Sequence, residues 1–269
     1  MSANLTRRQF LSLAGASGFA LALGLVGCGG AGTSSAPVST AASTGDKKYV
    51  IATDTVFAPF EFTNSSNEFV GIDVDILAAV AKEAGFAYEM PSLGFDAAVA
   101  ALESGQADGV MAGMSITEKR KEKYDFSESY YDSYPTITVK DGGPIASTDD
   151  LKGKTCAAKT GTTAADWAEA HKDQYGYTIS YFETSDLMYQ DVLTGNSAGC
   201  FEDYPVMAYG ISQGNGLKIL TKDESYKTPY AFAVLKGHNG ELLDLFKKGF
   251  DAIKANGTYD QIIGKYLKA

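Results

Sequence analysis

The length of 269 residues suits one large domain or two small ones. Hydrophobic residues make up 45% of the chain and aromatic residues 12%, which is enough to build a sizeable core. The formal net charge is −10, from 23 basic and 33 acidic residues. This balance argues against nucleic acid as a partner, because phosphate binding needs basic patches, and against adsorption to anionic lipid by charge alone.

The first 27 residues predict an export signal. Arg7 and Arg8 precede an apolar, mostly small run over residues 11–27, and a basic start before such a run is typical of a secretory signal peptide. The paired arginines followed by Phe10 are typical of the twin-arginine type. An uncleaved membrane-spanning anchor is the alternative, but the run is short and rich in glycine for that role.

Cys28 follows Leu25-Val26-Gly27, an arrangement that resembles a bacterial lipobox. We therefore expect Cys28 to be the lipidated first residue of the mature chain, attached to the membrane through its acyl chains. Residues 28–46 are rich in Gly, Ser, Thr and Ala, and this composition predicts a flexible tether. The expected location is extracytoplasmic, with the protein lipid-anchored to the cell membrane.

Strands and helices alternate in the first part of the body, which predicts an α/β fold with parallel strand pairing. Apolar residues Ile76, Val80 and Ala84 recur at helical spacing, so a helix is expected there. The other expected elements are strands at 48–54, 86–90 and 108–112 and a helix at 95–102 that ends near Gly105.

Residues 110–125 suggest a socket for a small carboxylate. Gly113 permits close approach of the backbone to a ligand. Ser115 and Thr117 place hydroxyls at the expected start of a helix, where unpaired backbone N–H groups accept anions. Arg120, three residues after the expected N-cap Thr117, adds a guanidinium suited to a carboxylate. The alternative is a capped surface helix with a solvated arginine.

The strand–helix pattern then restarts and predicts a second lobe. The expected elements are a turn at 149–154, strands at 155–159, 177–182 and 198–201, and helices at 161–167 and from a Ser185 cap to Gly195. Extended runs at 130–140 and 226–235 predict two crossings between the lobes, and therefore a hinge beside a ligand-binding cleft. An amphipathic helix at 240–255 and a short helix capped by Thr258 should follow.

Cys156 and Cys200 lie in strand-like runs of the second lobe. Buried thiols are the expected state, and a disulfide between them is the alternative that an oxidising compartment would permit. The chain has only two histidines, His171 and His238, and no Cys-x-x-Cys motif. We therefore expect no zinc or other metal site and no cofactor.

The motif Gly71-Ile72-Asp73-Val74-Asp75-Ile76, followed at fixed spacing by Val80-Ala81 and Ala84, resembles the signature of family 3 of the bacterial extracellular solute-binding proteins. Segments at 52–62, 112–121, 125–127, 159–162 and 256–259 continue the resemblance, which covers residues 47–268 and is strongest to glutamine-binding members. It implies two Rossmann-like lobes joined by a two-strand hinge, the type II periplasmic binding protein fold. The implied lobes are residues 47–130 with 231–269, and residues 131–230 with hinge strands at both ends.

The resemblance also implies a role for each motif residue around a free amino acid. Arg120 would pair with the α-carboxylate of the ligand, helped by the backbone N–H groups of Ser115 and Thr163. Asp203, the Gly113 carbonyl and the Ser115 hydroxyl would hold the α-ammonium. Considered alone, Asp203 could instead cap a helix that begins after it.

The ligand side chain would lie between Phe57 and Phe95, with the Ala112 carbonyl beside it. Asp54 and Lys159 would meet its distal amide, one accepting and one donating a hydrogen bond. Core aromatics, a turn-capping aspartate and an exposed lysine are the alternatives for these residues.

Glu202 departs from the glutamine-binding pattern, which has a histidine at this position. Asp54, Glu202 and Lys159 together would carry a charge of −1. That negative charge would favour a ligand with a cationic side chain, whereas the Lys159 ammonium would repel such a side chain. The expected ligand is therefore glutamine first, another polar amino acid second, and lysine, arginine or histidine as the alternative.

These features predict the substrate-binding lipoprotein of an ABC amino-acid importer, a monomer that passes its ligand to membrane permease subunits. A dehydratase-like enzyme on the same fold is one rival, but the chain has no GxSxG, HExxH or P-loop motif. Glu202 and Asp203 are adjacent, and on a strand they would face opposite sides and could not act as an acid–base pair. We therefore expect a binding protein and not an enzyme; a signalling receptor is the other rival.

Overall fold

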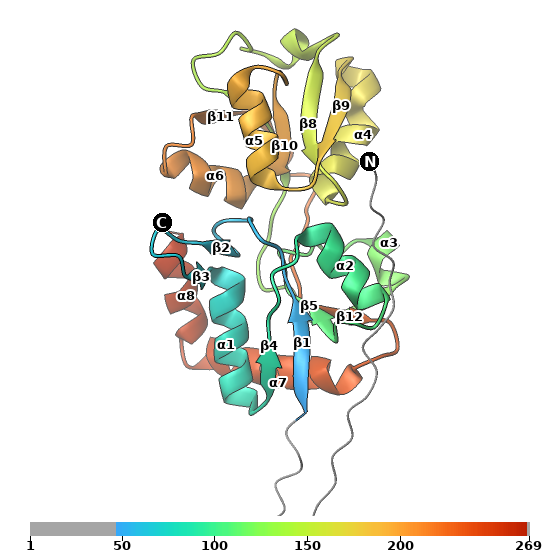
Figure 1. Ribbon diagram of the computed structural model, residues 1–269, viewed down its shortest axis with the longest axis vertical. Helices are drawn as coiled ribbons and strands as arrows, with labels where there is room; N and C mark the ends of the chain where they lie inside the picture. Colours follow the sequence, from blue (N-terminus) through green and yellow to red (C-terminus); the bar gives the residue numbers. More distant parts are fainter. Residues whose placement is uncertain (1–46, 268–269) are drawn as a thin grey trace, which may run out of the picture. The chain divides into compact units, whose positions relative to one another are not determined.

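The computed structural model describes residues 47–267. The predicted signal peptide (1–27), the predicted lipidation site Cys28 and the predicted tether (28–46) lie outside the described residues. Within residues 47–267 the chain forms two five-stranded sheets, each with its own helices (Figure 1). This architecture confirms the predicted fold class of two α/β lobes.

The first sheet has the strand order β4-β1-β5-β12-β6. Its strands are β1 (Lys48–Ala52), β4 (Ala87–Glu89), β5 (Gly109–Val110), β6 (Tyr124–Phe126) and β12 (Ala233–Leu235). β1 pairs in parallel with β4 and β5, whereas β12 runs antiparallel to β5 and β6. The expected parallel pairing is therefore correct around β1. β12, for which no pairing was predicted, is antiparallel because the chain returns from the second lobe in the opposite direction.

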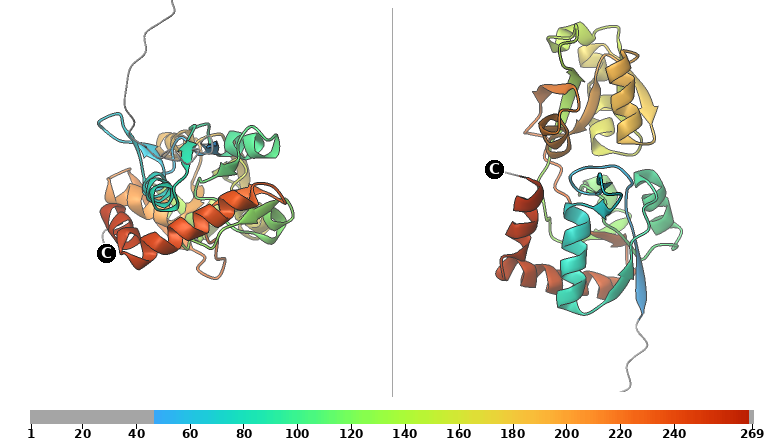
Figure 2. Two further views of the ribbon diagram at one scale, coloured as in Figure 1. Left: turned by 90° about the horizontal axis from the view of Figure 1, so that it is seen from below. Right: turned by 60° about the vertical axis from the view of Figure 1, so that its left-hand side comes forward.

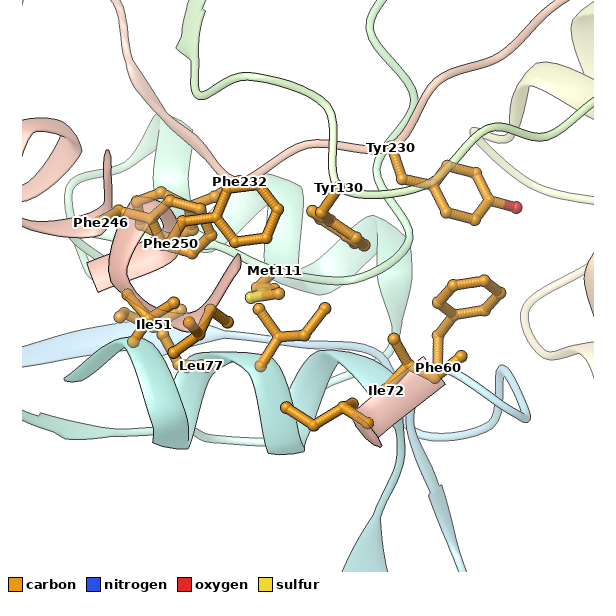
Figure 3. Close-up of a cluster of buried hydrophobic side chains, with 14 of the residues drawn as sticks. Ile51, Phe60, Ile72, Leu77, Met111, Tyr130, Tyr230, Phe232, Phe246 and Phe250 are labelled. Atoms are coloured by element: carbon orange, nitrogen blue, oxygen red, sulfur yellow. The ribbon is translucent and has the colours of Figure 1, made fainter. Parts of the chain in front are cut away.

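Helices α1 (Ile72–Ala84) and α7 (Gly240–Ala255) build the core of the first lobe. Ile51 of β1, Leu77 of α1 and Phe246 of α7 are fully buried in one cluster (Figure 3). Gly249 of α7 lies against α1, where an added Cβ would be 2.4 Å from the Val80 carbonyl oxygen. The other elements of this lobe are β2 (Phe62–Thr63), β3 (Phe69–Val70), α2 (Phe95–Glu103), α3 (Glu118–Lys121) and α8 (Thr258–Tyr266).

The second sheet has the strand order β11-β7-β10-β8-β9. Its elements are β7 (Pro135–Lys140), η1 (Thr148–Leu151), β8 (Thr155–Lys159), α4 (Thr163–Tyr175), β9 (Thr178–Phe182), α5 (Ser185–Thr194), β10 (Cys200–Asp203), α6 (Tyr204–Ser212) and β11 (Leu217–Lys222). β8 is parallel to both β9 and β10, and β7 is antiparallel to β10 and β11. Because β8 and β10 are parallel, their carboxyl ends bring Lys159 and Asp203 to the same edge of the sheet.

Two crossing segments, residues 127–134 and 223–232, join the sheets and pair with each other (Figure 2). Tyr230 N–H donates to the Tyr131 carbonyl at 2.7 Å, and Tyr130 N–H donates to the Tyr230 carbonyl at 2.9 Å. Two paired crossings are the geometry of a hinge. We retain 47–130 with 231–269, and 131–230, as the proposed limits of the lobes.

Helix ends differ from the expectations in several places. Thr184, and not Ser185, occupies the N-cap position of α5, and Gly257, and not Thr258, occupies that of α8. α4 continues well beyond residue 167, because no helix breaker intervenes before Gly176, which ends it in the left-handed conformation. On α7 the expected apolar face is buried except for Leu245, which is only partly covered.

Strand ends also differ. β1 stops at Ala52 and β5 at Val110, so residues 53–54 and 111–112, which were expected to end these strands, lie beyond them. β11 and the β2–β3 hairpin were not expected, and α6 was expected only as the helix that Asp203 could cap. A Pro205 in the first turn of α6 is a helix-start signal that the sequence carries. The expected turn at 149–154 begins as the short helix η1, held by a capping box between Ser147 and Asp150.

Within residues 47–267, Cys156 and Cys200 are buried and form no disulfide, which is the expected state of these thiols. Burial raises the pKa of Cys156 to about 12. Among residues 47–267 no helix has the length and apolar composition needed to cross a membrane. The same part of the chain brings no three His, Cys, Asp or Glu side chains close enough together to hold a metal ion.

Candidate ligand-binding cleft

Every residue predicted to contact a ligand lines one cavity between the two lobes. The first lobe contributes Asp54, Phe57, Phe95, Ala112, Gly113, Ser115 and Arg120, and the second contributes Lys159, Thr163, Glu202 and Asp203. Many of these residues end or follow the strands β1, β5, β8 and β10. The carboxyl ends of parallel strands are where open α/β sheets place their ligands.

Asp54 and Lys159 form an ion pair between the lobes. Each side chain is only 2% exposed, so the alternative of an exposed lysine is wrong. The Asp54 carboxylate also accepts from Thr55 N–H at 2.6 Å, and Lys159 Nζ lies 5.2 Å from the centre of the Phe57 ring. The pair brings one donor and one acceptor to the cavity and cancels its own charge.

Arg120 is held by carbonyl groups of both lobes. Its guanidinium donates to the Ser115 carbonyl at 2.8 Å and to the Gly161 carbonyl at 3.0 Å, and it lies 5.4 Å from the centre of the Phe95 ring. Thr117 caps α3 as predicted, because its hydroxyl accepts from the Arg120 backbone N–H at 3.1 Å. Burial lowers the pKa of Arg120, yet a guanidinium remains cationic in proteins.

The N-terminus of α4 faces the same cavity. Thr162 is the N-cap, and its hydroxyl accepts from the Ala165 N–H at 3.1 Å. The hydroxyls of Thr163 and Ser115 are hydrogen-bonded across the cleft at 3.2 Å. Thr162 is not among the predicted site residues, although a threonine before a helix is a cap signal in the sequence. Because a helix N-terminus attracts anions, it adds to the positive charge of Arg120.

Gly113 forms part of the cavity floor in a conformation that only glycine adopts readily. Its φ is +53°, and an added Cβ would lie 2.4 Å from the Phe57 ring. Its N–H donates to the carboxylate of Asp73 at 2.8 Å. Phe57 and Phe95 are each 6% exposed, so both are packed as core aromatics and also form walls of the cavity.

Asp203 ends β10 and is 5% exposed. Its Oδ2 accepts from the Tyr230 hydroxyl, whereas Oδ1 has no partner among the described residues. Asp203 occupies the N-cap position of α6, as the alternative expected, but its side chain makes no capping bond there. Burial and the adjacent Glu202 charge raise the pKa of Asp203 to about 7. A carboxylate with one free buried oxygen suits a ligand ammonium group.

Glu202 is engaged within its own lobe. Its carboxylate accepts from the hydroxyls of Ser185 at 3.1 Å and Tyr189 at 2.6 Å, and from the Asp203 N–H at 2.9 Å. Burial raises the pKa of Glu202. These bonds tie β10 to α5, so Glu202 has a structural task besides lining the cavity. Glu202 and Asp203 bind different partners, as expected for neighbours on a strand.

The cavity is small in this structure. Its volume open to the centre of a water molecule is about 10 Å³, close to the about 10–15 Å³ that a single water needs. A larger ligand therefore enters only when the lobes separate or the side chains withdraw.

Residues 49–269 match the model of the bacterial extracellular solute-binding proteins, family 3. A protein of Neisseria gonorrhoeae named "Probable histidine-binding protein" is 31% identical over 249 residues, which cover 91% of each chain. An ancestral arginine-binding protein has been solved bound to arginine and bound to glutamine. Both structures have a TM-score of 0.74 and 34% identity, covering 82% of this chain and 98% of that one.

Substrate-binding domain 2 of GlnP from Lactococcus lactis, in an open conformation, is 44% identical but has a TM-score of 0.56, over 82% of this chain and 95% of that one. The TM-score is lower for this open structure than for the ligand-bound ancestral protein, although the sequence identity is higher. This difference indicates that the two lobes of this chain are arranged more as in the ligand-bound structures than as in the open one. The ion pair between Asp54 and Lys159 agrees with such an arrangement. The chain belongs to family 3 of the bacterial extracellular solute-binding proteins.

Proposed function

We propose that the protein binds a free amino acid between its lobes as the substrate-binding subunit of an ABC importer, and that glutamine is the preferred ligand. The observation that carries this proposal is the distribution of charge around the cavity. Arg120 and the α4 N-terminus supply positive potential, and Asp203 has an unpaired carboxylate oxygen. Asp54 and Lys159 cancel each other at the remaining polar position.

The two charges of a free amino acid fit the positive potential at Arg120 and the α4 N-terminus and the carboxylate of Asp203. The α-carboxylate would form a bidentate pair with the Arg120 guanidinium. This pair would replace the hydrogen bonds that Arg120 now donates to backbone carbonyls. The α-ammonium would donate to Asp203 Oδ1, to the Gly113 carbonyl and to the Ser115 hydroxyl. The positive ligand would also keep Asp203 ionised, because a nearby cation lowers a carboxyl pKa.

The Asp54–Lys159 ion pair selects the side chain of the ligand. An amide offers an acceptor for the Lys159 ammonium and a donor for the Asp54 carboxylate. It can therefore lie between the two groups without leaving either charge unpaired. An acidic side chain would face Asp54 and a basic one would face Lys159, and each would add an uncompensated charge to a buried site.

A cationic amino acid is the second candidate. Asp54 and Glu202 together place two carboxylates near one lysine, and similar proteins are named for histidine and arginine. In this case the ligand cation would pair with Asp54 or Glu202, and the Lys159 ammonium would have to move away.

The experiment that tests the proposal is thermal unfolding of the purified protein with each of the twenty amino acids. A ligand present at about 1,000 times its dissociation constant adds about 4 kcal/mol to stability, and each kcal/mol raises the midpoint by about 2–4 °C for a body of this size. Glutamine should give the largest rise. A response to none of the twenty, in protein free of co-purified ligand, would contradict amino-acid binding.

The variant Lys159→Met separates the two candidates. It keeps most of the length of the side chain and removes its charge. If glutamine is the ligand, its dissociation constant should increase by about tenfold or more, because a charged donor is lost. If the ligand is cationic, the same change should tighten binding. Lys172→Met is the matched control, since Lys172 is 42% exposed on α4 and outside the cavity.

The proposal extends to location and partners. Residues 1–27 would direct export, Cys28 would carry the lipid, and the body would act as a monomer that releases its ligand unchanged to the permease. Incorporation of labelled fatty acid into the protein, and its loss in Cys28→Ala, would test the anchor. Conversion of the bound amino acid during incubation would contradict a binding role and support the dehydratase alternative.

A further inference from the structure

Glu61 and Asp73 are two acidic side chains buried behind the floor of the cleft. Both are 0% exposed. Among the described residues, neither oxygen of Glu61 has a hydrogen-bond partner, and neither does Asp73 Oδ1. Buried carboxylate oxygens without partners are costly and rare, so the two groups must be compensated in some other way.

The backbone brings the two residues close together. Asp73 N–H donates to the carbonyl of Phe60, the residue before Glu61, at 2.9 Å. Gly71 makes this approach possible, because an added Cβ would lie 2.0 Å from the Phe60 carbonyl oxygen. Glu61 and Asp73 are then neighbours, and each carboxyl group shifts the pKa of the other. A proton on one of them would pair them.

We infer that Glu61 and Asp73 share one buried proton, and that the pair is a positioning device for the Ala112 carbonyl in the ligand cleft. Glu61 O–H donates to Asp73 Oδ1, and Asp73 remains an anion. The unpaired acceptor of Asp73 and one oxygen of Glu61 are thereby satisfied. A single negative charge is buried instead of two.

The surroundings favour the proton on Glu61. Burial raises the pKa of both groups, that of Asp73 to about 6 and that of Glu61 well above its usual range, helped by the negative charge of Asp73. The other groups that face Glu61 are Asp54, which raises its pKa, and Lys159, which lowers it. Tyr130 faces the pair as a neutral donor, because burial raises its own pKa far above 10.

The charge of Asp73 reaches the cleft through one peptide group. Asp73 Oδ2 accepts from the Gly113 N–H at 2.8 Å. That N–H and the Ala112 carbonyl belong to the same planar trans peptide, so they point in opposite directions. Ala112 lines the cavity. A carboxylate on the N–H side polarises the peptide, so it both orients the Ala112 carbonyl toward the ligand and strengthens it as an acceptor.

The same carboxylate also holds the start of the hinge. Asp73 Oδ2 accepts from the Tyr130 hydroxyl at 2.8 Å, and Tyr130 pairs with Tyr230 on the other crossing. Tyr230 in turn donates to Asp203. Figure 3 shows both tyrosines on the crossings above Phe60. The effect on ligand affinity rests on the proposed function, whereas the shared proton does not.

Infrared spectroscopy tests the proton directly. We compare the protein with Glu61→Gln and with the exposed control Glu83→Gln at about pH 8, one unit above the pKa of about 7 of Asp203. The carbonyl band of a protonated carboxylic acid should disappear in Glu61→Gln and persist in Glu83→Gln. A spectrum without any such loss would mean that Glu61 is ionised, and would overturn the inference whether or not glutamine binds.

Titration with glutamine tests the positioning role. Glu61→Gln keeps a donor toward Asp73, so its dissociation constant should stay within about threefold of the parent value, whereas Glu61→Leu and Asp73→Asn should raise it by about tenfold. The parent should lose affinity at alkaline pH, as Glu61 ionises, and Glu61→Gln should lose less. Equal pH profiles, or unchanged affinity in Asp73→Asn, would overturn the positioning role. Failure of the parent to bind glutamine would count against the proposed function alone.

Discussion

Neutralising one member of the Asp54–Lys159 pair should destabilise the protein far more than neutralising a surface ion pair. Both side chains are 2% exposed, so Asp54→Asn would leave the Lys159 ammonium buried without its counter-ion. Removing one partner of a buried pair costs about 3–5 kcal/mol, whereas exposed pairs contribute about 0.2–1 kcal/mol. The double variant Asp54→Asn/Lys159→Met removes both charges, and should lose less than the sum of the single changes.

The assay is urea unfolding of the parent, both single variants and the double variant, with the free energy of unfolding taken from midpoint and slope. The coupling energy of this cycle should be about 2 kcal/mol or more. The control cycle uses Lys247 and Asp251 of α7, whose side chains are 67% and 50% exposed, and it should give less than about 0.5 kcal/mol. The reasoning would be refuted if each single variant lost less than about 1 kcal/mol of unfolding free energy and the two losses simply added up to that of the double variant. Such a result would mean that water reaches both charges.

Three further predictions follow from other contacts. Arg120→Lys should raise the dissociation constant for the amino acid by about tenfold or more in calorimetric titration, because an ammonium cannot make the bidentate pair. The pKa of Asp203 is raised to about 7, above the unfolded value of about 3.9. Its contribution to the stability of the folded protein is therefore complete below pH 4 and is lost as pH rises through 7, by about 1.4 kcal/mol between pH 6 and 8. Glu61 and Asp73 also have raised pKa values and lose stability over the same range, so urea unfolding at both pH values should show a loss in both proteins, larger in the parent than in Asp203→Asn by about 1.4 kcal/mol. Gly249→Ala should cost about 1–3 kcal/mol, since its Cβ would be 2.4 Å from the Val80 carbonyl oxygen. Gly264→Ala, at a helical glycine with open space around it, should stabilise by up to about 1 kcal/mol.

Each of these predictions has a clear contrary result. An Arg120→Lys protein that binds within about threefold of the parent would remove the guanidinium from the carboxylate site. A loss of stability between pH 6 and 8 that is equally large in the parent and in Asp203→Asn would mean that Asp203 does not contribute to it. Gly249→Ala and Gly264→Ala proteins of equal stability would mean that α1 and α7 are not packed at backbone contact.

The sequence located the candidate site well because strand ends converge. Asp54, Lys159 and Asp203 each stand at or just after a buried strand, and parallel strands bring such positions to one edge. Arg120 was found through local chemistry, since Thr117 caps its helix within the same short segment. These are features of spacing and of local hydrogen bonding, which a sequence displays directly.

What the sequence could not show are contacts between distant segments. Asp54 and Lys159 meet each other across the cleft, and Glu202 is bound by hydroxyls of α5. No local pattern encodes such pairings, since they depend on how the two lobes fold and close. The direction of β12 was missed for the same reason, because it is set by the return of the chain through the second crossing. The contact of Glu61 with Asp73 likewise depends on packing at Gly71.

The measurement that tests the central claim most directly is calorimetric titration with glutamine and two analogues. One analogue carries a neutral amide in place of the α-carboxylate, and the other lacks the α-ammonium. If Arg120 binds the α-carboxylate and Asp203 the α-ammonium of the same molecule, glutamine should bind. Each analogue should then bind at least about tenfold more weakly, because a charge-assisted hydrogen bond is lost. Binding of either analogue within about threefold of glutamine would contradict the account.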